Sequence, residues 1–548
     1  MIVWWIKYGI WKNILCADDS FKTVEIRKEM VYMKKYKELA TRRMMITALL
    51  MLLQIGWWII LLVKLQERLS YISFVTSVLG VVFVLYLVNT DHEPSAYKMG
   101  WIIIIMLFPL FGVPLYMFCG DKRPSKKLRG KLNISQNKIR DVSAQKPEVL
   151  DHLLSVDRRA GATSRFIWED EHFPVHENTE VTYYPESHLI YRAMLEAMEQ
   201  AEHFIFLEFF IIEVGEMWNP MVDILTRKAK EGVEVKILYD DMGSVTYLPL
   251  NYRKKLESID PHIKCESFNH IGLMFSMVMN HRDHRKILVI DGHTAFTGGI
   301  NLSDRYININ SPFGYWKDTG IRLVGDAVYN YTEMFLEMWT SVRPEEAPSV
   351  DLKEYMPHRW HPEPFTGQGF VQPYGDDPLD DNPLAENIYI DMLGQVKDYV
   401  YIFTPYLILS DELRNSLIMA AKRGVDVKIV TPGIPDKKTV YQVTRSNYSA
   451  LLQVGIEIYE FTPGFIHAKS MVCDDKMAIV GTINWDFRSL FLHFECASWF
   501  YGCKAVLDVK RDVFETIGKS RKIEPGEFRP GWWGGCVNSV LRVFSPLL

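Results

Sequence analysis

The sequence lacks paired cysteines. Its seven cysteines are scattered along the chain, with no CxxC pair and no spacing typical of metal ligands. A zinc site needs closely spaced ligands, and a disulfide framework is typical of short, cysteine-rich chains. We therefore expect reduced thiols and neither of those two features.

Net positive charge is also missing. The 62 Lys and Arg residues are outnumbered by 67 Asp and Glu residues, which leaves a formal net charge of -5. General affinity for nucleic acid depends on an excess of cations that neutralise phosphates. We expect no nucleic-acid partner, although a local basic patch remains compatible with an anionic surface.

Long apolar runs, in contrast, are present near the start. Three of them, Met44–Val63, Tyr71–Val88 and Met99–Cys119, contain no charged residue. Each approaches the roughly 20 residues that a helix needs to cross a bilayer. The first run begins well inside the chain and is followed at once by the others, so a cleaved signal peptide is not expected. The pattern predicts N-terminal transmembrane helices.

Basic clusters flank this anchor on both sides, at residues 34–43 and 122–131. Because positive flanks tend to stay in the cytoplasm, the two clusters together require an even number of crossings. One run would then be re-entrant or interfacial, either the third, which contains Pro109 and Pro114, or the short second one. The body that follows is expected in the cytoplasm.

The body repeats itself. Residues 229–237 read AKEGVEVKI, and residues 421–429 read AKRGVDVKI. Helical and β-rich stretches alternate in both copies, which predicts an α/β fold with layered helices and sheet in two duplicated halves. The expected helices are Ser187–Ala201, Pro220–Lys230, Pro383–Val396 and Asp411–Arg423, and the expected strands are Phe204–Ile212, Val233–Tyr239, Tyr399–Leu407 and Val425–Val430.

These observations give a domain plan. We expect a cytoplasmic or interfacial segment at residues 1–43, a transmembrane region at 44–120, a basic juxtamembrane linker at 121–180, the two halves at 181–345 and 346–525, and a C-terminal tail at 526–548. The linker cations either meet anionic lipid headgroups or are simply solvated. The apolar residues of the tail fall near helical spacing, so it either rests on the membrane interface or packs on the protein. A Pro/Gly-rich stretch at 344–378 connects the halves.

One chemical pattern, His-x-Lys-x-x-x-x-Asp, occurs once in each half. The first copy is His284, Lys286 and Asp291, the second is His467, Lys469 and Asp474, and seventeen residues after each His stands an Asn, Asn301 in GGIN and Asn484 in GTIN. A single copy would be a weak signal, but two copies at equal offsets in a duplicated fold are specific. A pseudo-symmetric phosphodiester site needs such pairs, because one imidazole can attack phosphorus while the other transfers a proton.

The spacing suggests a role for each residue type. In a strand, residues two apart share a face, so each His would point with its Lys into one pocket. The two Asn amides, beside glycines that allow close backbone approach, would bind phosphate oxygens together with the lysines. No metal and no cofactor are expected, because lysine and amide groups can hold the phosphoryl oxygens.

The acidic residues have two expected roles. Asp291 and Asp474 cannot share the face of their His, so we assign them to bracing a turn first and to the catalytic set second. Asp318 and Glu495 are the candidates for orienting the imidazoles through their second nitrogen. Three further histidines, His281, His293 and His493, lack the paired context, and surface or loop roles are expected for them.

From about Trp101 to Leu548 the chain resembles the phospholipase D superfamily, and within it the bacterial phospholipase-D-type cardiolipin synthases. The matching segments are Asn280–Lys286, Gly298–Asn301, Tyr315–Thr319, Thr404–Tyr406, Pro463–Lys469 and Gly481–Ser489. Three positions depart from the usual pattern. Cys473 replaces an aliphatic residue, Trp485 replaces Leu, and His493 replaces Asn.

The resemblance implies a cardiolipin synthase that moves a phosphatidyl group between two phosphatidylglycerol molecules and releases glycerol. His284 would form a phosphohistidine, and His467 would protonate the glycerol and then deprotonate the second lipid. The two motifs are nearly equivalent, so only the resemblance selects His284 as nucleophile. The expected partners are phosphatidylglycerol and membrane lipids, and the expected location is a bacterial cell membrane with several crossings. The oligomeric state is not indicated.

Two rival functions remain. A membrane-bound phospholipase D would hand the same intermediate to water and release phosphatidic acid, and the sequence barely separates it from a transferase. A catalytically silent lipid-binding scaffold would keep the fold without the chemistry. The intact pairs of His, Lys and Asn argue against the scaffold.

Overall fold

The structure is a computed structural model that describes residues 56, 70–90, 95–120, 126–140, 144–269, 281–380, 382–528 and 532–544. The chain divides into two compact units, Met1–Val78 and Leu79–Leu548. The first predicted apolar run, residues 44–63, lies outside the described residues except for Gly56. All features discussed below belong to the second unit, apart from the start of α3.

The other two apolar runs form helices. The second run lies in α3 (Ser70–Val88), and the third is divided between α4 (Ser95–Leu107) and α5 (Pro109–Cys119). The break falls at Pro109, which has no N–H to continue α4 but suits the first turn of α5. The chain then folds back so closely that a Cβ added to Gly112 would lie only 2.7 Å from the Cα of Ile105. In the described part of the chain, no helix combines the length and apolar character that a bilayer crossing requires.

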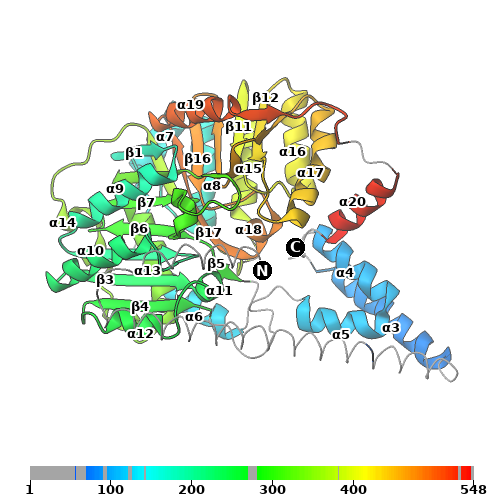
Figure 1. The fold of residues 1–548 in the computed structure, drawn as a ribbon, viewed down its shortest axis with the longest axis horizontal. Coiled ribbons are helices and arrows are strands. Elements are labelled where there is room, and N and C mark those ends of the chain that lie inside the picture. Colours follow the sequence, from blue (N-terminus) through cyan, green and yellow to red (C-terminus); the bar gives the residue numbers. More distant parts are fainter. Residues whose placement is uncertain are drawn as a thin grey trace, which may run out of the picture. The chain divides into compact units, whose positions relative to one another are not determined.

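The first half of the body is built on one sheet. Within the described residues it has seven strands in the order β1-β9-β7-β6-β2-β3-β4. The strands are β1 (Thr179–Tyr184), β2 (Phe204–Phe209), β3 (Glu234–Asp240), β4 (Ile263–Phe268), β6 (Lys286–Ile290), β7 (Thr294–Gly298) and β9 (Gly320–Gly325), and the main helices are α9 (Ser187–Glu199), α10 (Trp218–Lys230) and α13 (Val328–Val342). They appear in cyan to green in Figure 1.

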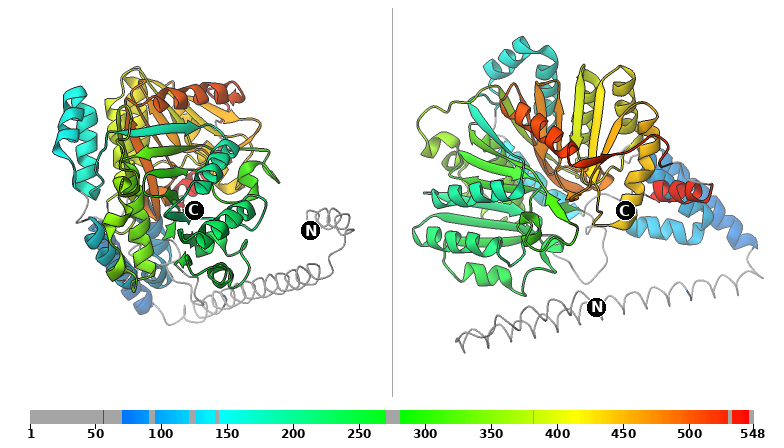
Figure 2. Two further views of the ribbon diagram at one scale, coloured as in Figure 1. Left: turned by 90° about the vertical axis from the view of Figure 1, so that its left-hand side faces the viewer. Right: turned by 45° about the horizontal axis from the view of Figure 1, so that its top comes forward.

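The second half repeats this arrangement strand for strand, in the order β10-β17-β16-β15-β11-β12-β13, with β18 added at the edge. The strands are β10 (Phe370–Asp376), β11 (Tyr399–Phe403), β12 (Asp426–Pro432), β13 (Glu457–Phe461), β15 (Ser470–Cys473), β16 (Met477–Gly481), β17 (His493–Tyr501) and β18 (Ser520–Lys522), and the helices are α15 (Leu384–Gln395), α16 (Asp411–Lys422), α17 (Lys438–Leu452), α18 (Phe487–Phe491) and α19 (Ala505–Ile517). Both sheets are seen in Figure 2. The predicted duplicated α/β fold is confirmed.

Both faces of the first sheet are buried, as its strand sequences require. Alternate residues of β2 enter different cores: Ile205 and Leu207 pack with α9 and α10, whereas Phe206 faces the other way and stacks on Phe335 of α13 at 4.6 Å. A strand covered on both sides reads as a continuous apolar run, which explains why FIFLEF shows no polar alternation.

The segments around the two halves are also folded. The expected linker contains α6 (Lys126–Arg140), α7 (Pro147–Val156) and α8 (Arg158–Glu171), and α6 packs along α13. The Pro/Gly-rich connection ends in β10, which lies at the edge of the sheet among the described strands, where Pro373 is tolerated. The tail forms α20 (Trp532–Phe544), which packs on α17 and α4. Of the two alternatives for the tail, the membrane interface or the protein's own surface, the structure shows residues 532–544 packed on the protein.

Two short ladders tie the halves together. β5 (Arg282–Asp283) pairs in parallel with the start of β17, so that Arg282 is opposite His493. In the same way β14 (Gly464–Ile466) pairs in parallel with β8 (Tyr315–Lys317). In each ladder, the residues just before one His-x-Lys motif pair with a strand of the other half. We call this exchange the crossing, and it positions the site.

Candidate active site

The motif histidines lie in the links between strands. His284 stands between β5 and β6, and His467 between β14 and β15. The prediction that each His and its Lys lie within one strand is therefore wrong for both histidines and for Lys469, which precedes β15; only Lys286, the first residue of β6, lies in a strand. The reason is the crossing: the His284 N–H donates to the carbonyl of Phe494 at 2.9 Å, and the His467 N–H donates to that of Lys317 at 2.7 Å. Each histidine thus leaves its own sheet to bond the other half.

The residue that follows each of these carbonyl acceptors has a carboxylate side chain. Nδ1 of His284 lies 2.8 and 2.9 Å from the two oxygens of Glu495. Nδ1 of His467 lies 2.6 Å from Oδ2 of Asp318. Both carboxylates are fully buried. Because Nδ1 of each ring is engaged by the opposite half, Nε2 is the nitrogen left for chemistry.

The imidazole rings are held between aromatic side chains. Phe210 lies edge-on to His284 with ring centroids 4.9 Å apart, and Trp316 lies 5.1 Å from His467. Each histidine is only 7% exposed. Aromatic walls of this kind fix the rings and exclude water, which strengthens every electrostatic interaction in the pocket.

Burial sets the protonation of the histidines. It lowers the pKa of His284 to about 3 and that of His467 to about 4, so both rings are neutral near pH 7 in the protein alone. A neutral His284 suits attack on phosphorus. His467 needs a proton to act as an acid, and an anionic phosphodiester beside it would raise its pKa. Burial opposes ionisation of Asp318, but the charges of His467 (when protonated) and Lys469 outweigh it and lower the pKa of Asp318.

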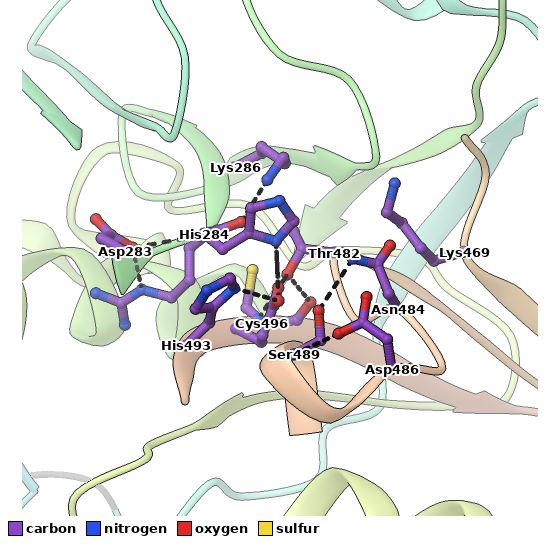
Figure 3. Close-up of polar contacts among 12 residues, drawn as sticks. Asp283, His284, Lys286, Lys469, Thr482, Asn484, Asp486, Ser489, His493 and Cys496 are labelled. Carbon is purple, nitrogen blue, oxygen red and sulfur yellow. Dashed lines mark hydrogen bonds and ion pairs between the residues drawn. The ribbon is translucent and has the colours of Figure 1, made fainter. Parts of the chain in front are cut away.

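The two lysines bring cations from both halves to the same place. Each Nζ donates to the carbonyl of the His two residues before it. Burial lowers the pKa of Lys286 to about 8 and that of Lys469 to about 7. The pKa of His467 is lowered mainly by burial and next by the charge of Lys469. The charge of Lys286, from the other half, lowers it further. His284, Lys286, Lys469 and Asn484 lie around one region in Figure 3.

The two asparagine amides are held in an equivalent way. Nδ2 of Asn301 donates to the hydroxyl of Tyr306 at 2.7 Å, and Nδ2 of Asn484 donates to Oγ of Ser489 at 3.0 Å. One hydrogen of each amide is thereby used, and the second is available for a phosphate oxygen. Sequence reasoning missed Tyr306 and Ser489. A signal was present, because each hydroxyl follows its Asn by five residues.

The glycines before the asparagines make room for protein groups. A Cβ on Gly299 would lie 2.0 Å from Oδ1 of Asp318, and a Cβ on Gly481 would lie 2.4 Å from the carbonyl oxygen of Cys496. Any side chain at Gly299 would therefore push Asp318 away from His467. Gly299 and Gly481 therefore allow the segments that carry Asp318 and Glu495 to lie close to them. The GGIN and GTIN patterns alone do not reveal this role.

Asp291 and Asp474 lie at the far ends of β6 and β15. The carboxylate of Asp291 accepts N–H bonds from Glu202, His203 and Phe204 at 2.8 Å. Asp474 accepts three equivalent bonds from residues 397–399. Both residues have a positive φ, 50° and 52°, which Asp tolerates better than most residues. These contacts hold the loop that precedes a central strand and do not involve His284 or His467.

This geometry predicts a stability effect at Asp291. In D291A, three N–H groups, of which that of Phe204 is buried, lose a charged acceptor, so we expect a loss of about 3 kcal/mol of unfolding free energy. D291N keeps an acceptor and the preference for positive φ, and it should lose markedly less. Thermal unfolding of the two variants, together with activity per folded molecule, checks this. A D291A protein as stable as wild type but as inactive as a His284 variant would contradict the structural role.

His493, which belongs to no paired motif in the sequence, also lies at the site. Its ring centroid is 5.5 Å from that of His284, and its Nδ1 is 3.8 Å from Oε1 of Glu495. The expectation of a surface or loop role is therefore wrong for His493. Among the described residues, the set of His284, His493 and Glu495 is the one group whose ligand atoms, all within 4.8 Å of one another, could hold a metal ion.

The chain is similar to known proteins over most of its length. Residues 194–339 and 389–516 match the family described as "Cardiolipin synthase, PLD-like domain", and residues 78–120 match "Phospholipase_D-nuclease N-terminal". An uncharacterized protein of Streptococcus mutans serotype c is 42% identical over 80% of this chain and 94% of its own. Cardiolipin synthases of Alkalihalophilus pseudofirmus and of a Geobacillus species are each 30% identical over 86% of this chain and 92% of their own.

Proposed function

The chain belongs to the cardiolipin synthase family with a phospholipase-D-like domain, and from this premise we propose that it transfers a phosphatidyl group from one phosphatidylglycerol to another. The products are cardiolipin and glycerol. The observation that carries the proposal is the crossed pair of imidazoles, each oriented by a carboxylate of the other half. One phosphodiester is exchanged for another, so the reaction needs no activated co-substrate.

The first step is proposed to form a covalent intermediate. Nε2 of His284 attacks phosphorus, the bond from phosphorus to the glycerol oxygen breaks, and protonated His467 gives its proton to that oxygen. The negative charge on the phosphoryl oxygens is stabilised by the two lysines and the two asparagine amides. Glu495 accepts the Nδ1 hydrogen of His284, which supports the positive charge that the ring gains during attack.

The second step reverses the roles. A terminal hydroxyl of the second phosphatidylglycerol gives its proton to the now neutral His467 and attacks phosphorus. The bond between phosphorus and His284 breaks, and its electron pair returns to the ring. Both histidines are then in their starting states. The buried pocket favours transfer to a lipid over hydrolysis only if water is kept out while the intermediate exists.

Product analysis tests this function. Purified protein is incubated with phosphatidylglycerol vesicles, and lipids and free glycerol are quantified. Equal amounts of cardiolipin and glycerol are expected, and added glycerol should drive the reaction backwards. Phosphatidic acid as the main product would instead identify the rival phospholipase D.

We further propose that α3, α4 and α5 contact the bilayer, with the catalytic body on the cytoplasmic side of a bacterial cell membrane. Large apolar side chains stay exposed on these helices, among them Leu79, Val82, Met106 and Phe111. Such a surface is unusual for a protein in water and is typical of one that meets lipid. Tyr97 of α4 stacks on Phe487 of α18 at 6.1 Å, which links these helices to the loop that carries Asn484.

The lysines make headgroup binding pH dependent. Burial lowers the pKa of Lys469 to about 7 and that of Lys286 to about 8. Each lysine is charged below its pKa and neutral above it, so the attraction for an anionic phosphodiester is present at low pH and lost as pH rises. We expect short-chain phosphatidylglycerol to bind H284A, which cannot turn it over, at least about tenfold more weakly at alkaline than at mildly acidic pH. Calorimetric titration measures this. K469Q should lose the lower of the two transitions, and unchanged affinity across the range would contradict the role of the lysines.

A further inference from the structure

His493 gives Glu495 a second imidazole. The carboxylate already bonds Nδ1 of His284 at 2.8 Å, and Nδ1 of His493 approaches the same oxygen, Oε1, at 3.8 Å. Nδ1 of His493 is buried and has no hydrogen-bond partner among the described residues. Figure 3 shows the rings of His284 and His493 near each other. An unused nitrogen thus points at a carboxylate that serves another histidine.

Two imidazole nitrogens and one carboxylate oxygen form a set that suits zinc and similar metals. With bonds of about 2.0–2.2 Å, tetrahedral ligand atoms stand roughly 3.4 Å apart. The atoms here are 2.8 and 3.8 Å from Oε1, so small shifts of the rings would bring them into place. Thr482 donates to the other oxygen, Oε2, which leaves Oε1 free to face a metal.

We propose that His284, His493 and Glu495 form a binding site for a late first-row divalent metal such as Zn²⁺, and that occupation of this site inhibits the enzyme. The metal binds the lone pair of Nδ1 of His284 in place of the hydrogen bond to Glu495, and the proton of that nitrogen moves through solvent to Nε2. Nε2 then carries a hydrogen and has no lone pair with which to attack phosphorus. Inhibition rests on the proposed function, whereas metal binding does not.

The site depends on His493, which supplies the second imidazole nitrogen. An Asn side chain is a poor ligand for Zn²⁺, so replacing His493 with Asn should remove the site. Mg²⁺ and Ca²⁺ prefer oxygen ligands and should not bind.

Metal binding is tested on the full chain purified in detergent. Zn²⁺ is titrated in competition with a coloured chelator into wild type, H493N and H493Q. The control is H188N, which removes an exposed histidine of α9 and so reports adventitious surface binding. Wild type and H188N should bind one Zn²⁺ alike, and both His493 variants should bind it at least about tenfold more weakly. Equal binding by folded wild type and His493 variants would overturn the proposal.

Inhibition is tested with phosphatidylglycerol vesicles at buffered free Zn²⁺. Each variant is compared with its own activity in chelator, so an effect of the substitution itself cancels. The Zn²⁺ concentration that halves activity should rise at least about tenfold in H493N and H493Q, and chelator should restore wild-type activity. Equal sensitivity of wild type and variants would place the inhibitory metal elsewhere and overturn the proposal. Absence of cardiolipin in chelator would contradict the proposed function and leave the binding result standing.

Discussion

Replacing His284 with alanine should slow cardiolipin formation by on the order of 10⁴- to 10⁶-fold. The variant loses the nucleophile, and His467, which also has an orienting carboxylate and an adjacent lysine, is already needed as the acid and base. H467A should lose a similar factor, because the same ring serves as acid in one step and base in the next. Initial rates with phosphatidylglycerol vesicles measure both.

The control for these variants is H293A. His293 belongs to the same half and is partly buried, but it contacts Thr294 at the turn beyond β6 and not the pocket. We expect this variant to stay within a few-fold of wild type, about 1 kcal/mol at most in activation free energy. Activity of H284A or H467A comparable with that of H293A would revive the view of a scaffold without catalysis.

The second large effect concerns the crossed carboxylates. E495Q and D318N should each slow turnover by about 10²- to 10⁴-fold, because an amide stabilises neither the tautomer nor the cation of its histidine. The crossing makes a finer statement. Glu495 should act through the nucleophile His284, and Asp318 through the acid His467.

A phosphodiester with an acidic phenol as leaving group separates the two. Such a group departs without protonation, so loss of the general acid matters little in the first step. The single-turnover release of the phenol should therefore be largely restored in D318N and H467A but remain slow in E495Q and H284A. If D318N instead behaved like H284A, each carboxylate would serve the histidine of its own half, and the crossed assignment would fail.

Much of this arrangement could be predicted because the chain repeats itself. The paired sequences AKEGVEVKI and AKRGVDVKI mark equivalent helix and strand junctions, and the observed elements α10 and β3, and α16 and β12, lie there. Pattern within each copy also pointed to His284, His467 and the two lysines. Such local information is sufficient where a residue's position follows from its own strand.

The crossing could not be predicted in this way. His284 and Glu495 are 211 residues apart, and the ladder between β5 and β17 that brings them together contains only two residue pairs. No periodicity marks so short a strand. His493 was missed for a related reason: as a single histidine without a second copy, it carried no repeat signal, and only the pairing opposite Arg282 places it beside His284.

The most direct measurement of the proposed chemistry is to locate the covalent intermediate. H467A is mixed with the activated phosphodiester, so that the first step proceeds while the second lacks its base. The protein is then denatured without acid, because a bond between phosphorus and imidazole nitrogen is acid labile, and its peptides are examined by mass spectrometry. The two-step account predicts a phosphatidyl group on His284. Release of a full equivalent of phenol with no adduct on His284 would contradict it.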